Sequence, residues 1–202
     1  MAKKTKLLKG LRNIHFAPYI DGAFQTPKPI TFAKKIENTL NYESETEWAD
    51  DEIVDQSNGY NGGEGTITTL GLTSEEQSTL FGNEIVKGGI VVKTTDESPT
   101  GAFLFERGKK GSTAKRLYVV YACKCSPSSF NGETVEEGKS SASESEISYT
   151  ISNLPSGEIY HFIDTDDLTV DPEAITNWFT EVQMPKPLEE RRLESKINEK
   201  KA

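Results

Sequence analysis

Alternation of apolar and polar residues is the sequence feature that most constrains what this chain can fold into. Between residues 115 and 125 every second residue is apolar or a cysteine. A period of two is the repeat of a β-strand with one buried face. We expect one face of this strand to carry Leu117, Val119, Tyr121, Cys123 and Cys125.

The same alternation recurs along most of the chain. A long strand is expected to start near Ile30 and to carry Ile30, Phe32, Ile36, Leu40 and Tyr42 on one face. Many short strands separated by turn residues favour an antiparallel β-sandwich or barrel. Further strands are expected at residues 66–72, 84–93, 102–106, 147–151 and 159–163.

Two short helices are expected to flank the strands. Thr73 and Glu76 have the spacing of a capping box, and Gly82 can supply the left-handed exit, which predicts a helix over residues 74–81. Asp171 followed by Pro172 is a second helix start, with a capping carboxylate before proline at the first helical position. The fold class is thus mainly β with one or two short α-helices.

Charge divides the chain into regions. Thirty-two Asp and Glu against 23 Lys and Arg give a net charge of −9, a field that repels nucleic-acid phosphates. We expect one β domain over residues 1–185, with a basic arm at residues 1–10 and a charged tail at residues 186–202.

No run of apolar residues reaches a membrane-spanning length and the amino end does not have the pattern of a secretory signal. Two cysteines in such a chain indicate a reducing compartment.

Residues 43–63 stand out as a long acidic segment between two strands. It holds seven acids and no base and is longer than a tight hairpin turn. We therefore predict a long acidic loop. Large apolar residues inside a charged loop usually bury against their own domain or another chain. The candidates for contact between subunits are Glu43, Glu45, Glu47, Trp48, Asp50, Asp51, Ile53, Val54 and Tyr60.

Catalytic, cofactor and metal sites are not expected. The cysteines and the two histidines, His15 and His161, have no metal-site spacing, and small buried cysteines on an apolar strand are common. Residues 164–171 are acidic but lack the central glycine and final glutamate of a calcium loop, so a turn and a helix cap explain them better. The glycines at 59–65 lack the lysine of a phosphate loop. Residues 108–112 are expected to form a hairpin turn whose lysines protect a sheet edge.

Several short stretches together resemble the major tail proteins, or tail tube proteins, of bacteriophages with long non-contractile tails. The resemblance spans roughly residues 10–165 and is diffuse. The chain departs from the pattern in an extended glycine turn, in Trp48 where tyrosine is expected, and in the charged tail after Met184. It rests on residues 10–19, Asp21-Gly22, Thr26-Pro27, Ala49-Asp50-Asp51, Asn58-Gly59-Tyr60, Gly65-Thr66-Ile67, Leu72-Thr73 and Phe81-Gly82.

This resemblance implies a structural role in a virion tail. It implies a β-sandwich or barrel with a flanking helix, assembled as stacked, hexameric rings around a tape-measure protein, with tail terminator and baseplate proteins as further partners. Viral DNA would pass through the tube without specific binding, and assembly would occur in the host cytoplasm. The implied subunit is not an enzyme and needs no cofactor or membrane. Excess carboxylates fit a wall that DNA does not adhere to.

A second class of function stays open at this point. A ligand-binding β-sandwich, such as a carbohydrate-binding or adhesin-like module, could use Trp48, Tyr60 and Tyr19 as a stacking platform. These aromatic residues do not share one predicted strand. A stacking platform would require the fold to bring them together.

Overall fold

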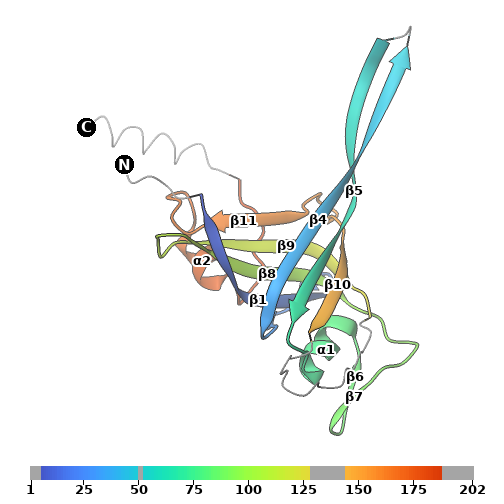
Figure 1. The fold of residues 1–202 in the computed structure, drawn as a ribbon, viewed down its shortest axis with the longest axis vertical. Coiled ribbons are helices and arrows are strands. Elements are labelled where there is room, and N and C mark those ends of the chain that lie inside the picture. Colours follow the sequence, from blue (N-terminus) through green and yellow to red (C-terminus); the bar gives the residue numbers. More distant parts are fainter. Residues whose placement is uncertain (1–5, 50–51, 128–143, 188–202) are drawn as a thin grey trace, which may run out of the picture.

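The computed structural model describes residues 6–49, 52–127 and 144–187. Most of them lie in antiparallel strands, which confirms the predicted fold class, and no helix among them has the length and apolar character of a membrane span. The elements (Figure 1) are β1 (Leu8–Ile20), β2 (Ala23–Phe24), β3 (Lys28–Pro29), β4 (Ala33–Ala49), β5 (Glu52–Thr69), α1 (Ser74–Phe81), β6 (Glu84–Val86), β7 (Gly89–Val91), β8 (Thr100–Lys109), β9 (Lys115–Cys125), β10 (Ser145–Ile151), β11 (Tyr160–Asp164) and α2 (Pro172–Asn177).

One large antiparallel sheet organises the molecule. Its strands follow the order β2-β1-β8-β9-β10-β5-β4, with β3 paired to β1 and β11 paired to β9. The sheet divides at β9, where Cys123 and Cys125 pair with β10 while residues 116–120 pair with β11. This division lets β10, β5 and β4 turn back over β1, β8 and β9, in a sandwich-like arrangement.

Two groups of buried side chains hold the sheet. The inner cluster lies between the two parts of the sheet and is closed by Leu80 and Phe81 of α1. The outer cluster lies on the other face of β8 and β9 around Trp178. The inner cluster comprises Ile14, Phe16, Ile30, Ile67, Leu80, Phe81, Phe103, Phe105, Val120, Cys123, Cys125, Ile147, Tyr149 and Ile151; the outer comprises Ala17, Ala102, Leu104, Leu117, Val119, Tyr121, Ala122 and Trp178.

A β-bulge divides strand β9 between these clusters. Opposite the step from Gly101 to Phe103 of β8, β9 has one residue more than its partner, and Ala122 takes a positive φ of 46°. An extra residue reverses the faces of a strand, because side chains alternate. The prediction of one common face was therefore wrong. Leu117, Val119 and Tyr121 belong to the outer cluster, and Cys123 and Cys125 to the inner one.

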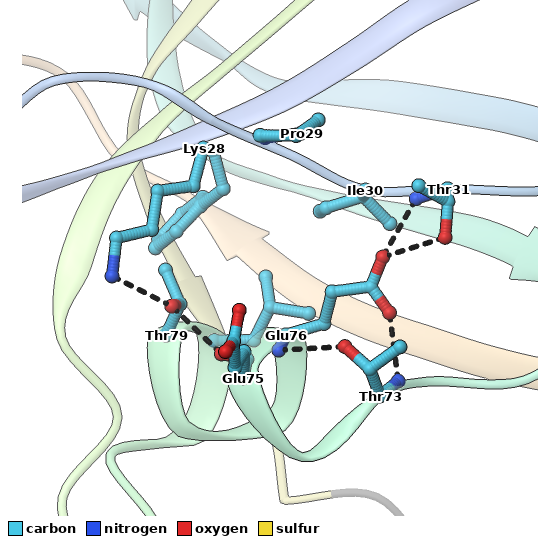
Figure 2. A pocket seen from close by; sticks show the side chains of 10 residues that line it. Lys28, Pro29, Ile30, Thr31, Thr73, Glu75, Glu76 and Thr79 are labelled. Atoms are coloured by element: carbon cyan, nitrogen blue, oxygen red, sulfur yellow. Dashed lines mark hydrogen bonds between the residues drawn. The ribbon is translucent and has the colours of Figure 1, made fainter.

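Helix α1 begins and ends where the sequence predicted. Thr73 accepts from the backbone N–H of Glu76 at 3.2 Å, and a Glu76 carboxylate oxygen accepts from the N–H of Thr73 at 2.7 Å. Gly82 follows in the left-handed conformation. The other Glu76 oxygen accepts from the N–H and hydroxyl of Thr31 (Figure 2). The capping box thus also fastens the helix to the segment before β4.

The carboxyl-terminal region covers the outer face of the sheet. Asp171 caps α2 by accepting from the N–H of Glu173 at 3.1 Å, as predicted. Trp178 directly after the helix is fully buried, and its indole N–H donates to the carbonyl of Tyr118 at 3.3 Å. The hydroxyl of Tyr121 donates to the carbonyl of Gln183 at 2.5 Å. The six-residue helix is therefore held in place more by the contacts of Trp178 and Gln183 than by its own length.

The predicted acidic loop is wrong. Residues 43–49 and 52–63 lie in the strands β4 and β5, which pair along their whole length as a long hairpin. The hairpin projects far from the rest of the molecule (Figure 1). Acidic composition suggested a solvated loop, but cross-strand hydrogen bonds satisfy the backbone here, and charged residues are tolerated because the ribbon is exposed.

Three smaller expectations also need correction. Strand β1 starts at Leu8, so the end of the predicted basic arm is paired strand; residues 1–5 lie outside the described residues. Phe32 has a φ of 53° and is exposed, because it precedes β4 instead of lying in it. The predicted strand at 84–93 is a small hairpin of β6 and β7. Of the predicted charged tail, only residues 186 and 187 are described.

Candidate assembly surface

The distal part of the β4–β5 hairpin is the candidate functional surface. Strand β10 pairs with β5 only from Thr69 to Gly63. Beyond that point, within the described ranges, the two strands pair only with each other. We call this two-stranded part, residues 42–49 and 52–60, the arm. A two-stranded ribbon is at best marginally stable on its own, so the arm needs either a strong root or a partner.

The root of the arm is fastened to the body. A bulge lies where Leu40 pairs with Gly63 and Tyr42 with Tyr60, and Gly62 within it has a φ of 77°, which suits glycine. The hydroxyl of Tyr60 donates to the carbonyl of Ile151 at 2.9 Å, and its ring lies 5.6 Å from that of Tyr42. Burial, with a contribution from Tyr42, raises the pKa of Tyr60. This tyrosine therefore stays a neutral donor at physiological pH.

The strand register gives the arm an acidic face. Glu43, Glu45 and Glu47 occupy alternate positions of β4, and the residues opposite them are Gly59, Ser57 and Asp55. Ala49 and Glu52 form the next pair on this face. The register thus assigns five acidic positions to one face, and no lysine or arginine occurs among the described arm residues. Like charges this close repel each other, and a cationic partner would relieve that repulsion.

The opposite face of the arm is uncharged and continues the core-facing side of the sheet. Along β4 the even-numbered positions run from Ile36 and Leu40, which pack on the inner cluster, outward to Tyr42. Ile53 is 54% exposed and Tyr42 57% exposed. In the register, the uncharged pairs are Tyr42 with Tyr60, Ser44 with Asn58, Thr46 with Gln56, and Trp48 with Ile53.

Few side-chain contacts hold the arm. The Ser44 hydroxyl donates to the side-chain oxygen of Asn58 at 2.5 Å, and the Asn61 amide donates to the Glu43 carboxylate at the root. Of the residues predicted for contact between subunits, Asp50 and Asp51 lie outside the described residues. Glu45, Glu47, Trp48 and Val54 are placed by strand register only, Val54 being the extra residue of a second bulge.

The residues considered for catalysis or metal binding are dispersed. Cys123 and Cys125 are buried free thiols, and burial raises the pKa of both, that of Cys125 to about 12. The His15 ring packs on Phe179 at 4.9 Å. His161 lies 5.9 Å from the Trp178 ring, and burial lowers its pKa. Within the described ranges no three potential ligands gather around one point.

The acidic run at 164–171 is used for structure. Asp164 accepts two hydrogen bonds from Arg116, at 2.7 and 2.8 Å, and lies 3.2 Å from the Lys109 ammonium. Asp166 accepts from Lys109 at 2.5 Å. The hydrogen bonds from Arg116 lower the pKa of Asp164. The prediction that residues 164–171 form a turn and a helix cap was right, but the sequence did not predict their ion pairs with Lys109 and Arg116.

Lys109 was misinterpreted from the sequence. Its position in a Gly-Lys-Lys-Gly turn predicted an exposed lysine that protects a sheet edge. The side chain is instead 3% exposed. It pairs with Asp164 at the end of β11 and with Asp166 in the turn that follows, both more than fifty positions away in the chain. No local pattern carries this information, although the density of aspartates at 164–167 was a partial signal.

A groove of about 350 Å³ lies between β3 and α1. Figure 2 shows that Glu76 and Thr73 on its wall hydrogen-bond each other and Thr31. Lys28 lies 3.4 Å from the Thr79 hydroxyl. The carboxylate of Glu76 already accepts three hydrogen bonds, which, against the raising effect of burial, lower its pKa. The polar groups here therefore serve the helix cap.

Two of the three aromatic residues proposed for a stacking platform, Tyr19 and Tyr60, do not come together. Tyr19 packs edge-on against Phe24 at 4.9 Å, whereas Tyr60 packs against Tyr42 at the arm root. The two tyrosines belong to separate aromatic pairs. The geometry gives the ligand-binding alternative no specific support.

Fold and surface together define an antiparallel, sandwich-like β protein with two short helices and a projecting two-stranded arm. No family model and no curated protein matches the chain. Among solved structures, it is similar to the tube-terminating cap of the anti-feeding prophage, with a TM-score of 0.42 and 6% sequence identity over 80% of this chain and 96% of that one.

Proposed function

We propose that this chain is a structural subunit of a bacteriophage tail tube. Copies would assemble into rings, and the rings would stack into a tube around a tape-measure protein. The protein would then reside in the virion tail after assembly in the host cytoplasm, with tail terminator and baseplate proteins at the tube ends. The role is structural and needs neither catalysis nor a cofactor.

The observation that carries this proposal is the unpartnered arm. It extends the sheet beyond the body, and its two strands bond only to each other in the described chain. Strand edges with free backbone groups pair readily with another chain. Its uncharged face exposes Ile53 and Tyr42, which suits burial against a protein. An arm of this kind is expected in a subunit that binds copies of itself.

Tube formation needs two kinds of contact between identical subunits. A head-to-tail contact closes a ring, and a second, non-closing contact stacks rings. The arm is long enough to reach past its own body (Figure 1), so we assign it to the contact between stacked rings. A net charge of −9 would keep the passing DNA from condensing on the tube wall.

Removing the arm tests this proposal. Residues 43–59 are replaced by Asn-Gly, a two-residue turn that joins the directly opposed Tyr42 and Tyr60. The variant is expected to keep its circular dichroism and cooperative melting, because both clusters of buried residues are left intact. In negative-stain micrographs, the full chain at high concentration should form tubes and the variant should not.

Two outcomes contradict the proposal in different ways. Tubes from the shortened variant would show that the arm does not stack rings. A full chain that stays monomeric at high concentration, as measured by sedimentation velocity, and forms neither rings nor tubes would contradict the tube function itself.

A further inference from the structure

One side of the body, on the left in Figure 1, is rich in cations. Strand β1 begins there, β8 and β9 meet in a turn there, and β11 ends there, as the pairs Leu8–Lys109, Arg107–Arg116 and Arg116–Asp164 show. We call this surface the basic end. It comprises residues 6–12, 106–116 and 160–167, with eight Lys or Arg and four Asp or Glu.

Three of the four acids of the basic end are paired with cations inside it. Glu106 binds Lys115 at 2.9 Å, and Asp164 and Asp166 form their ion pairs with Lys109 and Arg116. The excess positive charge therefore falls on the exposed lysines and arginine of β1 and the β8–β9 turn. Lys9, Arg12 and Lys110 are exposed and have no ion-pair partner in the part of the chain that the structure describes.

Lys9 and Lys110 lie close to each other at this surface. Lys9 pairs with Gly108 across β1 and β8, and the N–H of Lys110 donates to the carbonyl of Leu7 at 2.8 Å. Arg12 follows in β1 opposite Glu106. The buried Lys109 ion pairs hold the turn in place beneath them. The cations are thus presented by paired strands, a more rigid arrangement than a free terminus would give.

We infer that the acidic face of the arm of one copy docks on the basic end of a second copy. The arm carries the larger share of the excess negative charge, and the basic end carries unpaired positive charge on the same chain. Figure 1 shows the arm directed away from the end of the body where β11 and the start of β1 lie, so one copy cannot satisfy both surfaces by itself.

A second copy fits these surfaces for physical reasons. Complementary charges across an interface fix its orientation and raise the association rate more than the affinity. Affinity would come from burying apolar side chains such as Ile53. Because donor and acceptor surfaces differ, the contact is head-to-tail and propagates from copy to copy. This inference rests on the proposed self-assembly and specifies which surface the arm contacts.

Charge exchange between two variants tests the inference. One variant carries Glu43→Lys, Glu45→Lys and Glu47→Lys in the arm; the other carries Lys9→Glu and Lys110→Glu in the basic end. In each variant alone, the arm and the basic end of neighbouring copies carry charge of the same sign. The protein concentration needed for half-maximal sedimentation should therefore rise at least tenfold. An equimolar mixture restores opposite charges at each contact and should recover most of the assembly.

A matched control is Lys28→Glu with Lys87→Glu, which makes the same change in net charge at exposed positions outside the basic end. It should assemble like the unchanged protein. Equal loss in this control, or failure of the mixture to recover, would overturn the inference. Either result is meaningful only if the unchanged chain assembles; if that chain does not, the proposed function has failed instead.

Cross-linking locates the contact directly. Ser57 lies opposite Glu45 on the acidic face, and Ser112 lies in the β8–β9 turn; both are exposed. A Ser57→Cys chain mixed with a Ser112→Cys chain should give a mixed dimer with a short thiol cross-linker. Ser57→Cys alone should not cross-link to itself. Self-linking of that variant without mixed dimers would indicate pairing between two arms and would contradict docking on the basic end.

Discussion

The body and the arm are built from the same two strands but differ in what surrounds them. In the body, β5 lies between β10 and β4, and Ile67 is fully buried in the inner cluster. Towards the tip of the hairpin, the same strands form a ribbon whose apolar residues are exposed. Regular strand pairing therefore does not by itself show that the side chains of a strand are buried. The arm is regular in hydrogen bonding and incomplete in burial, which is typical of a surface that another molecule covers.

The largest expected effect concerns the body. Phe103 is fully buried and its ring lies 4.8 Å from Phe16 and 4.6 Å from Tyr149. Phe103→Ala should lower the free energy of unfolding by about 3–5 kcal/mol, because it leaves a cavity in the inner cluster. Urea denaturation followed by circular dichroism measures this. Phe103→Leu, as the control, should cost much less, and a loss below about 1 kcal/mol for the alanine variant would contradict the assigned core.

An intermediate effect is expected at the buried ion pairs beneath the basic end. Lys109→Met keeps the apolar stem but leaves Asp166 without its cation, and we expect a loss of about 1–3 kcal/mol at neutral pH. This is less than for a fully buried pair because both aspartates are partly exposed. The exposed neighbour provides a control, since Lys110→Met should leave the free energy of unfolding unchanged within about 0.5 kcal/mol.

The ion pairs also predict a pH dependence for the unchanged chain. The folded pKa of Asp164 lies below its ordinary value, because Arg116 donates to its carboxylate. Its contribution to stability is therefore present above the unfolded pKa of about 3.9 and is lost as the pH falls through the folded pKa. The difference between the unchanged chain and Lys109→Met should shrink in the same acidic range. A constant difference down to a pH of about 2 would contradict this assignment.

The smallest expected effect concerns the arm. Ile53→Ser removes an exposed apolar side chain, so the free energy of unfolding of the monomer should change by no more than about 0.5 kcal/mol. Thermal melting of dilute protein measures this. A loss approaching that of Phe103→Ala would mean that the arm packs on its own body and would remove the contrast between the two regions.

Local signals predicted several elements to the residue. The capping box of Thr73 and Glu76 with Gly82 gave both ends of α1. The Asp171-Pro172 signal gave the start of α2, although the helix ends at Asn177 and does not continue through Trp178 and Phe179 as predicted, and alternation gave the bounds of β9. These predictions succeeded because the deciding interactions join residues at most a few positions apart. The residues proposed for contact between subunits were chosen from their acidic and aromatic composition, and their role in that contact stays a prediction.

The pairing partner of each segment could not be obtained from the sequence alone. Alternating glutamates occur both in loops and on the exposed faces of strands. Only the pairing register with β5 shows that Glu43, Glu45 and Glu47 lie in a strand.

By itself, then, the sequence determined the β class, the helix caps and the concentration of negative charge between residues 43 and 55. Only the tertiary structure decided that this charge lies on one face of a projecting ribbon, that Ala122 reverses the faces of β9, and that Lys109 is buried. The physical reason is the distance along the chain between the residues that interact. Caps and alternation depend on neighbouring residues, whereas strand register, bulges and ion pairs depend on residues brought together from distant parts of the chain.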